Sequence, residues 1–415
     1  MANIKNSFHF KLISIIFILI PISLLTGPFL PDFFLSIISL YFLIISIKLK
    51  LFSYYKNFLV YVFFLFYIYL LMRGIFSEYP YESLIKYNGP IFYFRYILFV
   101  LGVKFLLDIS QENLKKFLFV LLSVVIFASL DGYFQWVFGF NVLGFKSPSI
   151  RVTGIFGSEE ILGHFLSHVT PLLVALLTFV FGTNKRKIIL YVAILILVPI
   201  MIFVTNDRAG LLKIVQFSIL IILLSNNFKL QVLISLCITI IVAFLLIKFA
   251  PDSFERFQHT LRDVSSTTIP YMPWAPSHET HFAVAIDMFF NNPFFGQGPQ
   301  LFKTLCQIEP KYISGCTSHP HNYYIQTIGE LGLIGVAFLF IGFFYTAFIL
   351  LKQFFAIWFT NNQNHILKDH YLFLICLMFL IFWPLIPNQS FYNNWLNVMV
   401  FLPMGFIAYF KNKKE

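Results

Sequence analysis

Apolar runs of roughly 20 residues recur along the whole 415-residue chain, separated by short polar junctions. Runs of this length are typical of helices that cross a bilayer, where backbone groups must bond within their own segment. The pattern predicts an all-α polytopic membrane protein, with residues 1–415 as a single integral membrane domain. We expect about twelve transmembrane helices, near residues 12–30, 32–48, 57–72, 90–108, 117–138, 162–182, 187–204, 209–226, 230–249, 323–351, 370–388 and 394–410.

The polar junctions predict an orientation. Lysines gather at alternate junctions and in the C-terminal KNKKE, so the positive-inside rule puts both termini in the cytoplasm. The opposite junctions hold four arginines on the side where that rule does not favour them. These are Arg151, Arg208, Arg256 and Arg262. The position of these arginines therefore needs an explanation other than membrane topology.

The largest outer junction is a loop at residues 251–321, which we expect to be periplasmic. Its middle, SSTTIPYMPWAPSHETHF, is rich in proline and predicts irregular structure. The segment HFAVAIDMFFNN predicts a short amphipathic helix ending at Pro293, with a turn at Gly296 and Gly298. No long-period repeat and no linker to a second domain is visible.

Composition supports the membrane assignment and excludes several functions. Hydrophobic residues make up 59% of the chain and charged residues 11%, whereas soluble domains average about 25% charged. The net charge of +11 serves topology first, so we expect no nucleic-acid partner. The run Leu12–Leu30 is too long for a signal-peptide core and predicts a retained span. No Walker, GxGxxG or HExxH motif occurs.

Two histidines precede the span at 323–351. Pro320 suits the first turn of a helix, which would put His321 at the helix N-terminus. The helix dipole there disfavours protonation, so His321 is a candidate general base, and the same helix end attracts anions such as phosphate. The alternative is that His319 and His321 merely cap the loop.

Cys306 and Cys316 lie in the same polar loop. With His319 and His321 they offer four zinc ligands, but the spacing fits no standard zinc pattern. An outward-facing compartment favours oxidation, so a Cys306–Cys316 disulfide is the better interpretation. It would contribute roughly 3 kcal/mol by restricting the unfolded chain. We expect no metal and no cofactor.

Arg208, in TNDRAG, is either a turn residue paired with Asp207 or a fixed cation that binds a diphosphate bidentately. Arg151 offers the same choice, with Glu159 or Glu160 as its neutralising partner. Arg256 and Arg262 are most simply solvated loop charges. Other polar residues give weaker signals: His278 and His281 share a helix face, and Asp131 and Gln135 lie near the outer end of a span.

With these motifs in order, the chain resembles the O-antigen ligase/polymerase superfamily of bacterial integral membrane proteins. Five blocks carry the resemblance, over roughly residues 130–340: DGYFQWVFGFNVLGF, RVTGIFGSEEILGHFLSHVTPLL, TNDRAGLL, MFFNNPFFGQGPQLF and CTSHPHNYYIQTIGELGLIG. The resemblance implies transfer of a glycan from a polyprenyl (undecaprenyl) diphosphate carrier at the periplasmic face of the inner membrane. The acceptor is lipid A–core in ligases and another repeat unit in polymerases; the mechanism is metal-independent and inverting.

Residue by residue, the resemblance implies that His321 is the catalytic base and that Arg208 grips the donor diphosphate. An arginine that many members carry in the large loop is replaced here by His278, so that residue, Arg256 or Arg262 takes over its phosphate. The remaining residues expected to bind the diphosphate or glycan are Arg151, His319, Asn322 and Glu330. We favour a ligase acting in lipopolysaccharide biosynthesis, with a polymerase as the alternative.

Two interpretations from other classes remain. A secondary transporter or flippase would carry polar groups near the bilayer midplane, often in two related halves, whereas here they gather at one face. A receptor or assembly protein would use the large loop only as a docking surface. Membrane lipids are expected neighbours in every case.

Overall fold

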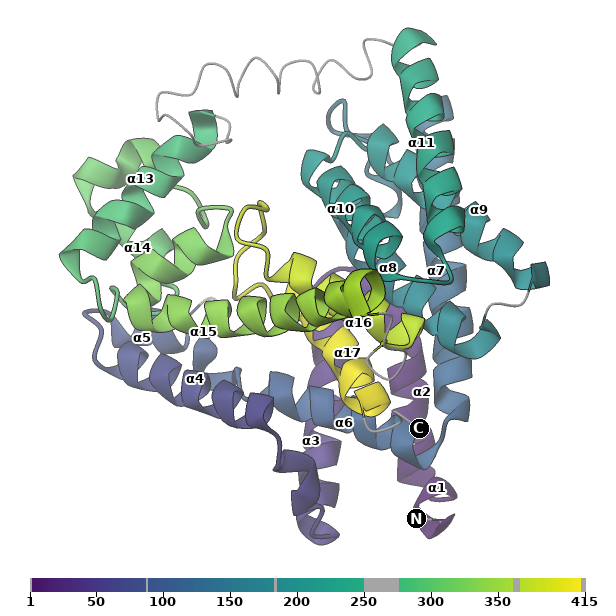
Figure 1. Cartoon of the computed structure of the whole chain (residues 1–415). Helices are drawn as coiled ribbons and strands as arrows, with labels where there is room; N and C mark the ends of the chain where they lie inside the picture. Colours follow the sequence, from purple (N-terminus) through teal and green to yellow (C-terminus); the bar gives the residue numbers. More distant parts are fainter. Residues whose placement is uncertain (1, 87–88, 183–184, 250–275, 361–365, 412–415) are drawn as a thin grey trace.

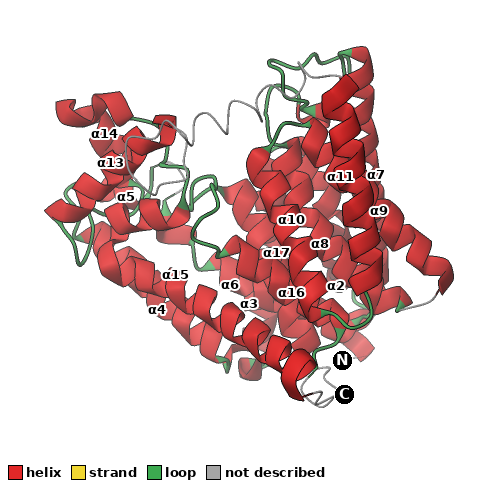
Figure 2. Cartoon of the chain, turned by 45° about the horizontal axis from the view of Figure 1, so that its top comes forward, coloured by secondary structure: helices red, strands yellow, loops and turns green. Residues whose placement is uncertain are grey.

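The computed structural model describes residues 2–86, 89–182, 185–249, 276–360 and 366–411 and consists of helices joined by short loops (Figures 1 and 2). The first half of the described chain contains α1 (Ala2–Lys5), α2 (Phe8–Ser23), η1 (Leu24–Thr26), α3 (Phe29–Lys48), η2 (Phe52–Tyr55), α4 (Phe58–Ile75), α5 (Pro80–Leu84), η3 (Pro90–Phe92), α6 (Arg95–Ile109), α7 (Glu112–Phe138), η4 (Gly154–Phe156), α8 (Leu162–Phe181) and α9 (Lys185–Val204). The second half contains α10 (Arg208–Leu224), α11 (Lys229–Phe249), α13 (Pro276–Asn291), α14 (Leu301–Ile308), η6 (Pro310–Gly315), α15 (Tyr323–Phe355), η7 (Ala356–Thr360), α16 (Asp369–Ile381) and α17 (Asn394–Lys411). The described residues contain no β-strand.

The prediction of an all-α polytopic membrane protein is confirmed. Among the described residues, eight helices are long and apolar enough to cross a membrane, and two shorter apolar helices are Ile188–Val204 and Asp369–Ile381. Only eight described helices meet the length and hydropathy of a span, but each of the segments expected to span the membrane overlaps a helix. Apolar periodicity and run length were therefore sufficient to find them.

The helices form two groups. In the main bundle α17 packs on α6, α6 on α3, α16 on α8 and α2 on α7. The second group, which we call the wing, consists of α4, α5, α13, α14 and α15. In both views α4 and α15 run side by side at an incline to the bundle, with α13 and α14 over the start of α15 (Figures 1 and 2).

The sequence predicts one continuous helix over 323–351, and this is wrong at one position. Gly332 interrupts α15 with φ 63° and ψ −163°, a conformation that only glycine adopts readily. An interrupted helix leaves backbone groups without their usual partners, which is costly in a membrane. The partners must come from elsewhere in the fold.

They come from the turn Pro293–Gly298, which we call the insertion turn. The N–H groups of Gln297 and Gly298 donate to the carbonyls of Gly329 and Glu330, at 3.1 and 2.8 Å. In return, Leu333 and Ile334 donate to the carbonyls of Pro293 and Phe294, at 2.9 and 3.3 Å. In an unbroken helix Leu333 and Ile334 would bond Gly329 and Glu330. The insertion turn therefore takes the place of one turn of helix hydrogen bonds.

The helix α4 fastens this junction from the other side. The Tyr69 hydroxyl donates to the Leu331 carbonyl at 2.6 Å, directly before the interruption. The Arg73 guanidinium donates to the carbonyls of Phe295 and Gly296, with its shortest bond, to Gly296, at 2.6 Å. Arg73 lies at the end of a predicted span, and sequence analysis gave it no role.

The predicted span at 370–388 is also too long. The helix α16 ends at Ile381, and residues 382–393 form a loop that contains Pro384 and Pro387. Proline cannot continue a helix, because it lacks the N–H and restricts the residue before it. We call residues 382–391 the clamp loop, because it bonds repeatedly to the start of α15.

The interruption can be tested with a pair of glycine substitutions. A Cβ on Gly332 would lie 2.5 Å from the Phe294 carbonyl carbon, whereas Gly182, with a similar φ of 56°, has no atom within 4 Å of such a Cβ. Gly182→Ala should therefore cost only backbone strain, about 1–3 kcal/mol. Gly332→Ala should cost clearly more and should open the insertion turn to protease. The measurements are thermal unfolding and limited proteolysis in detergent; equal losses in the two variants would contradict the proposed packing.

Candidate functional site

The candidate site lies where α15 begins. Asn322 is the N-cap residue, and its side-chain oxygen accepts hydrogen bonds from the N–H groups of Tyr324 and Ile325 at 2.9 and 3.1 Å. The helix therefore starts at Tyr323, and the expectation that Pro320 occupies its first turn is wrong. Asparagine caps a helix better than the residues around it, which explains the later start.

His321 lies directly before this cap, outside the first helical turn. Its φ of 56° is in the left-handed region, which is uncommon for a residue with a side chain. The clamp loop holds it there, because the N–H of Asn388 donates to the His321 carbonyl at 2.8 Å. Strained backbone of this kind persists only where the surroundings over-determine it, and it is enriched at functional sites.

The clamp loop also holds the residues that follow His321. The Asn322 side-chain nitrogen donates to the Pro384 carbonyl at 2.7 Å, and the Tyr324 hydroxyl donates to the Phe382 carbonyl at 2.6 Å. Gln326 accepts from the N–H of Phe391 at 2.9 Å. Both ends of the Asn322 amide are thus engaged within the fold.

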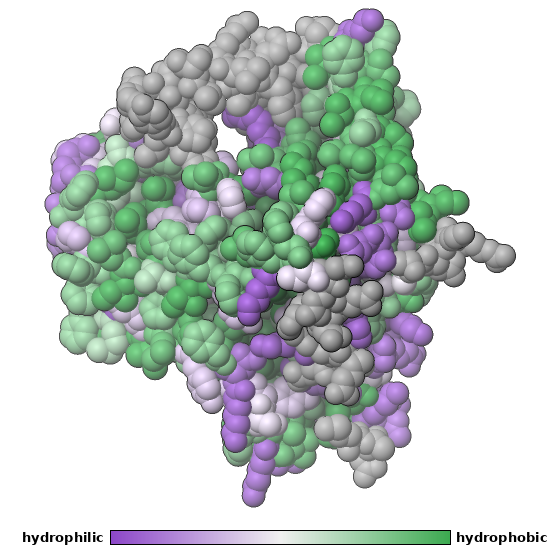
Figure 3. All heavy atoms as spheres, viewed as in Figure 1, coloured by the Kyte–Doolittle hydropathy of each residue, from purple (hydrophilic) through white to green (hydrophobic). Residues whose placement is uncertain are grey.

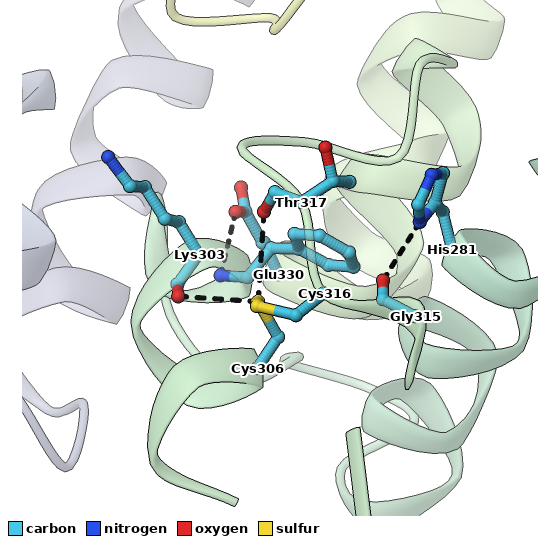
Figure 4. Close-up of a disulfide and its surroundings, with 8 residues drawn as sticks. His281, Lys303, Cys306, Gly315, Cys316, Thr317 and Glu330 are labelled. Carbon is cyan, nitrogen blue, oxygen red and sulfur yellow. Dashed lines mark hydrogen bonds between the residues drawn. A yellow bond between two sulfur atoms is a disulfide. The ribbon is translucent and has the colours of Figure 1, made fainter. Parts of the chain in front are cut away.

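Two further histidines lie beside His321. The ring centres of His319 and His321 are 4.2 Å apart, and those of His281 and His321 are 5.9 Å apart. His281, from α13, bonds through Nδ1 to the Gly315 carbonyl at 2.9 Å (Figure 4). Sequence analysis noted His281 only as a helix neighbour of His278. No three His, Cys, Asp or Glu residues of the described chain form a group with the geometry of a metal site.

The disulfide joins Cys306 of α14 to Cys316, with Cα atoms 5.1 Å apart, and closes the loop that precedes the histidines (Figure 4). The segment between them is tied to α13 as well. Hydrogen bonds from Lys311 and Tyr312 hold the pKa of the Asp287 carboxyl below its usual range. The approach to His321 is therefore fixed both covalently and by polar contacts.

Glu330 is 1% exposed and lies under α14 rather than in the open. Its Oε1 accepts from the N–H of Phe302, in the first turn of α14, at 3.0 Å, and its Oε2 accepts from Gln326 at 3.4 Å. The carboxylate caps α14, and the positive N-terminal end of that helix stabilises its negative charge. Its contacts are those of a positioning residue and leave the expected role in substrate binding without structural support.

The arginines of the outer junctions divide into two sets. Arg208 is the first residue of α10, and Asp207 before it is the N-cap residue, bonded to the N–H of Gly210 at 3.0 Å. Arg151 reaches the same turn: it lies 2.8 Å from Glu160 and 3.6 Å from Asp207. Arg256 and Arg262 lie outside the described residues. His278 is in the first turn of α13, and its side chain is not among those that the structure describes.

A buried polar chain connects α10 to His321. Lys213, 3% exposed, donates to the Asn388 side-chain oxygen at 3.2 Å and lies 3.1 Å from Nε2 of His168. His168 Nδ1 lies 2.8 Å from the His164 carbonyl, which can only accept, so Nδ1 carries the proton and Nε2 accepts from Lys213. Since Asn388 also binds His321, the chain runs from α8 and α10 to the candidate base.

Sequence analysis missed Lys213, His164, His168 and Asn388. A usable signal was present, since ionisable residues inside an apolar span are costly and mark functional candidates. Asp131 and Gln135, which gave only weak signals in the sequence, hold the loop that follows α7. Asp131 accepts a hydrogen bond from the N–H of Val142 at 2.9 Å, and Gln135 accepts one from the N–H of Gly154 at 2.7 Å.

The fold and the site first define a class: a polytopic helical membrane protein with a cluster of histidines at the start of α15 and a buried polar chain beside it. The sequence profile of the O-antigen ligase family matches residues 171–340, from α8 to the middle of α15. The match covers less than half of the chain and supports its resemblance to the O-antigen ligase/polymerase superfamily, which implies glycan and lipid-linked substrates in general. A search of the curated proteins finds no match to the chain.

The disulfide gives a prediction for this region. Removing it with Cys306→Ser/Cys316→Ser should weaken the segment by up to about 3 kcal/mol, because its short loop is no longer constrained when unfolded. Hydrogen exchange of residues 301–318 should then accelerate. Cys237→Ser, which removes an exposed free thiol, is the control and should change nothing there. Unchanged exchange in the double variant would mean that the polar contacts alone hold the segment.

Proposed function

We propose that the chain is an O-antigen ligase-type glycosyltransferase that moves a glycan from a polyprenyl (undecaprenyl) diphosphate carrier to an acceptor hydroxyl, with lipid A–core as the acceptor. The single observation that carries this proposal is the chain Lys213–Asn388–His321. It links a strained histidine at the mouth of α15 to the helix whose first residue is Arg208. A base and a phosphate-binding cation are the two groups that this reaction requires.

The proposed reaction is a single inverting displacement. An acceptor hydroxyl gives its proton to the His321 imidazole as its oxygen bonds to the anomeric carbon of the donor sugar. The bond from that carbon to the diphosphate oxygen breaks, and the diphosphate leaves with the electron pair. Arg208 stabilises its charge through planar, bidentate hydrogen bonds. A diphosphate is already a good leaving group, so neither a metal nor a nucleotide is needed.

The other expected residues take supporting roles in this proposal. His319 and His281 lie against His321 and would bind the glycan or hold the imidazole. Arg151 is bonded to Glu160, so we give it the weaker role of orienting the turn that carries Arg208. Arg256, Arg262 and His278 remain proposals for a second phosphate ligand from the 251–321 loop.

We place the site at the periplasmic face of the bacterial inner membrane, with both termini in the cytoplasm. Two features support this orientation. The termini lie at one end of the bundle (Figure 1), and the lysine-rich junctions follow the positive-inside rule. Arg208 is the first residue of α10, and His321 directly precedes the cap of α15; we assign both to the opposite end.

Substitution of the two central residues tests the proposal. His321→Ala should lower transfer by about 10²–10⁴-fold, the usual contribution of a general base. Arg208→Ala should raise the KM for the donor, and Arg208→Lys should restore only part of the binding, because lysine cannot bind bidentately. The measurement is transfer from the polyprenyl diphosphate glycan in membranes.

His9→Ala, at an exposed site beside the N-terminus, is the control and should transfer at the wild-type rate. Wild-type transfer by His321→Ala would exclude it as the base. The glycan banding of a deletion strain distinguishes a ligase from a polymerase. Full-length glycan left on the carrier indicates a ligase, and single repeat units on the core indicate a polymerase.

Lys213 should act as a positioning residue. Lys213→Met removes the donor that holds Asn388, so His321 should lose its alignment and kcat should fall by about tenfold or more, as for other losses of alignment. The KM for the donor should change little, because Arg208 remains. Lys229→Met, at the start of α11, is the control. Equal changes in kcat and KM, or the same loss in the control, would argue for general instability instead.

A further inference from the structure

A long cavity of about 450 Å³ separates the wing from the bundle. Helices α4 and α15 form one wall, and α6, α16 and α17 form the other. Along α17 it extends from Asn397 to Lys411, which at 1.5 Å per residue is about 21 Å. Most of its lining is aromatic or aliphatic, including Phe63, Phe338 and Phe401. Such a shape suits one extended hydrocarbon chain.

The charged residues of the lining are three lysines, Lys56, Lys104 and Lys411. They lie at the same end of the molecule. The helices α6 and α17 run parallel, since Tyr96 bonds to Asn394 and Val103 packs at Gly405, so Lys104 and Lys411 both lie toward their C-terminal ends. That end also carries both termini (Figure 1).

Lys56 joins them from the start of α4. Tyr54, two residues before it, donates to Asp108 at 2.8 Å, and the Lys104 ammonium lies 4.3 Å from the Tyr54 ring centre. Asp108 pairs with Lys104. Only Lys104 of the three is paired with a carboxylate there, which leaves an excess of positive charge among the lining residues at this end of the cavity.

The opposite end has a different character. It is lined by Tyr323, Phe391 and Asn397, and no charged residue of the described chain lines it there. A polyprenyl diphosphate bound for transfer would carry its charge toward Arg208 and His321, at that end. The lysines therefore favour a lipid whose charged head group lies at the other end of the cavity.

We propose that this cavity binds one anionic phospholipid, with its phosphate at Lys56, Lys104 and Lys411 and an acyl chain along α17. Lysines near a membrane surface each strengthen the binding of anionic lipids. The acyl chain would fill an apolar space that is costly to leave empty and would join the wing to the bundle. The space-filling view agrees with this polarity, since hydrophilic side chains gather at the end with the termini and the wing is largely hydrophobic (Figure 3). The choice of a phospholipid over the polyprenyl donor rests on the proposed function, whereas the lysines and the apolar lining do not.

The test uses the full-length chain in nanodiscs that contain phosphatidylglycerol and phosphatidylcholine with the same acyl chains, and native mass spectrometry of the retained lipid. The wild type should retain phosphatidylglycerol in preference. Lys56→Gln/Lys411→Gln should lower that preference by about 30-fold, from two lysine contacts. Lys48→Gln/Lys115→Gln, with the same change in net charge on exposed residues outside the lining, should keep it.

A second pair of variants tests the acyl-chain path. Ala408→Trp fills the cavity near the lysines and should abolish retention of either lipid, whereas Ala337→Trp, on an exposed face of α15, should not. Circular dichroism checks that each variant keeps its helices. Equal retention of the two head groups, loss of preference in the control pair, or a polyprenyl diphosphate retained in the cavity instead would each overturn the proposal.

Discussion

The interruption of α15 at Gly332 is the constraint on which the rest of the structure depends. A helix broken within a membrane exposes backbone groups that neither lipid nor water satisfies. Here the insertion turn and Tyr69 satisfy them, so residues far apart in the sequence share one hydrogen-bonded unit. The close approach also explains Gly296, whose Cβ would lie 2.3 Å from the Glu330 carbonyl carbon. The large loop cannot shift relative to α15 without breaking these bonds.

Two consequences follow for the start of α15. Helix α14 fixes the segment through Glu330, and the clamp loop fixes it through Asn322, Tyr324 and Gln326. His321 can then keep a left-handed backbone, because its neighbours on both sides are already held. Preorganisation of this kind removes the free-energy cost of ordering a catalytic base before it acts.

The membrane spans could be predicted from the sequence because run length and hydropathy are local properties. The interruption at Gly332 could not, because its partners lie 32–40 residues away in the insertion turn and 262 residues away at Tyr69, and the pattern around it stays apolar. The same local apolarity concealed the clamp loop, where Trp383, Leu385 and Ile386 extend the run although two prolines end the helix. Lys213 was concealed differently: one lysine in a span barely changes its mean hydropathy, but its contacts connect the site.

Glu330 illustrates how a motif residue expected at the substrate can have its contacts within the fold. Its place in the block after His321 suggested contact with substrate. In the fold, its carboxylate instead balances the first turn of α14, and its own carbonyl receives an N–H from the insertion turn. The motif residues thus divide at the Asn322 cap. The two histidines before it lie with their ring centres 4.2 Å apart, and the polar residues after it bond to the clamp loop and to α14. In the proposed reaction, the chemistry therefore falls to residues before the helix, and the helix itself supplies their support.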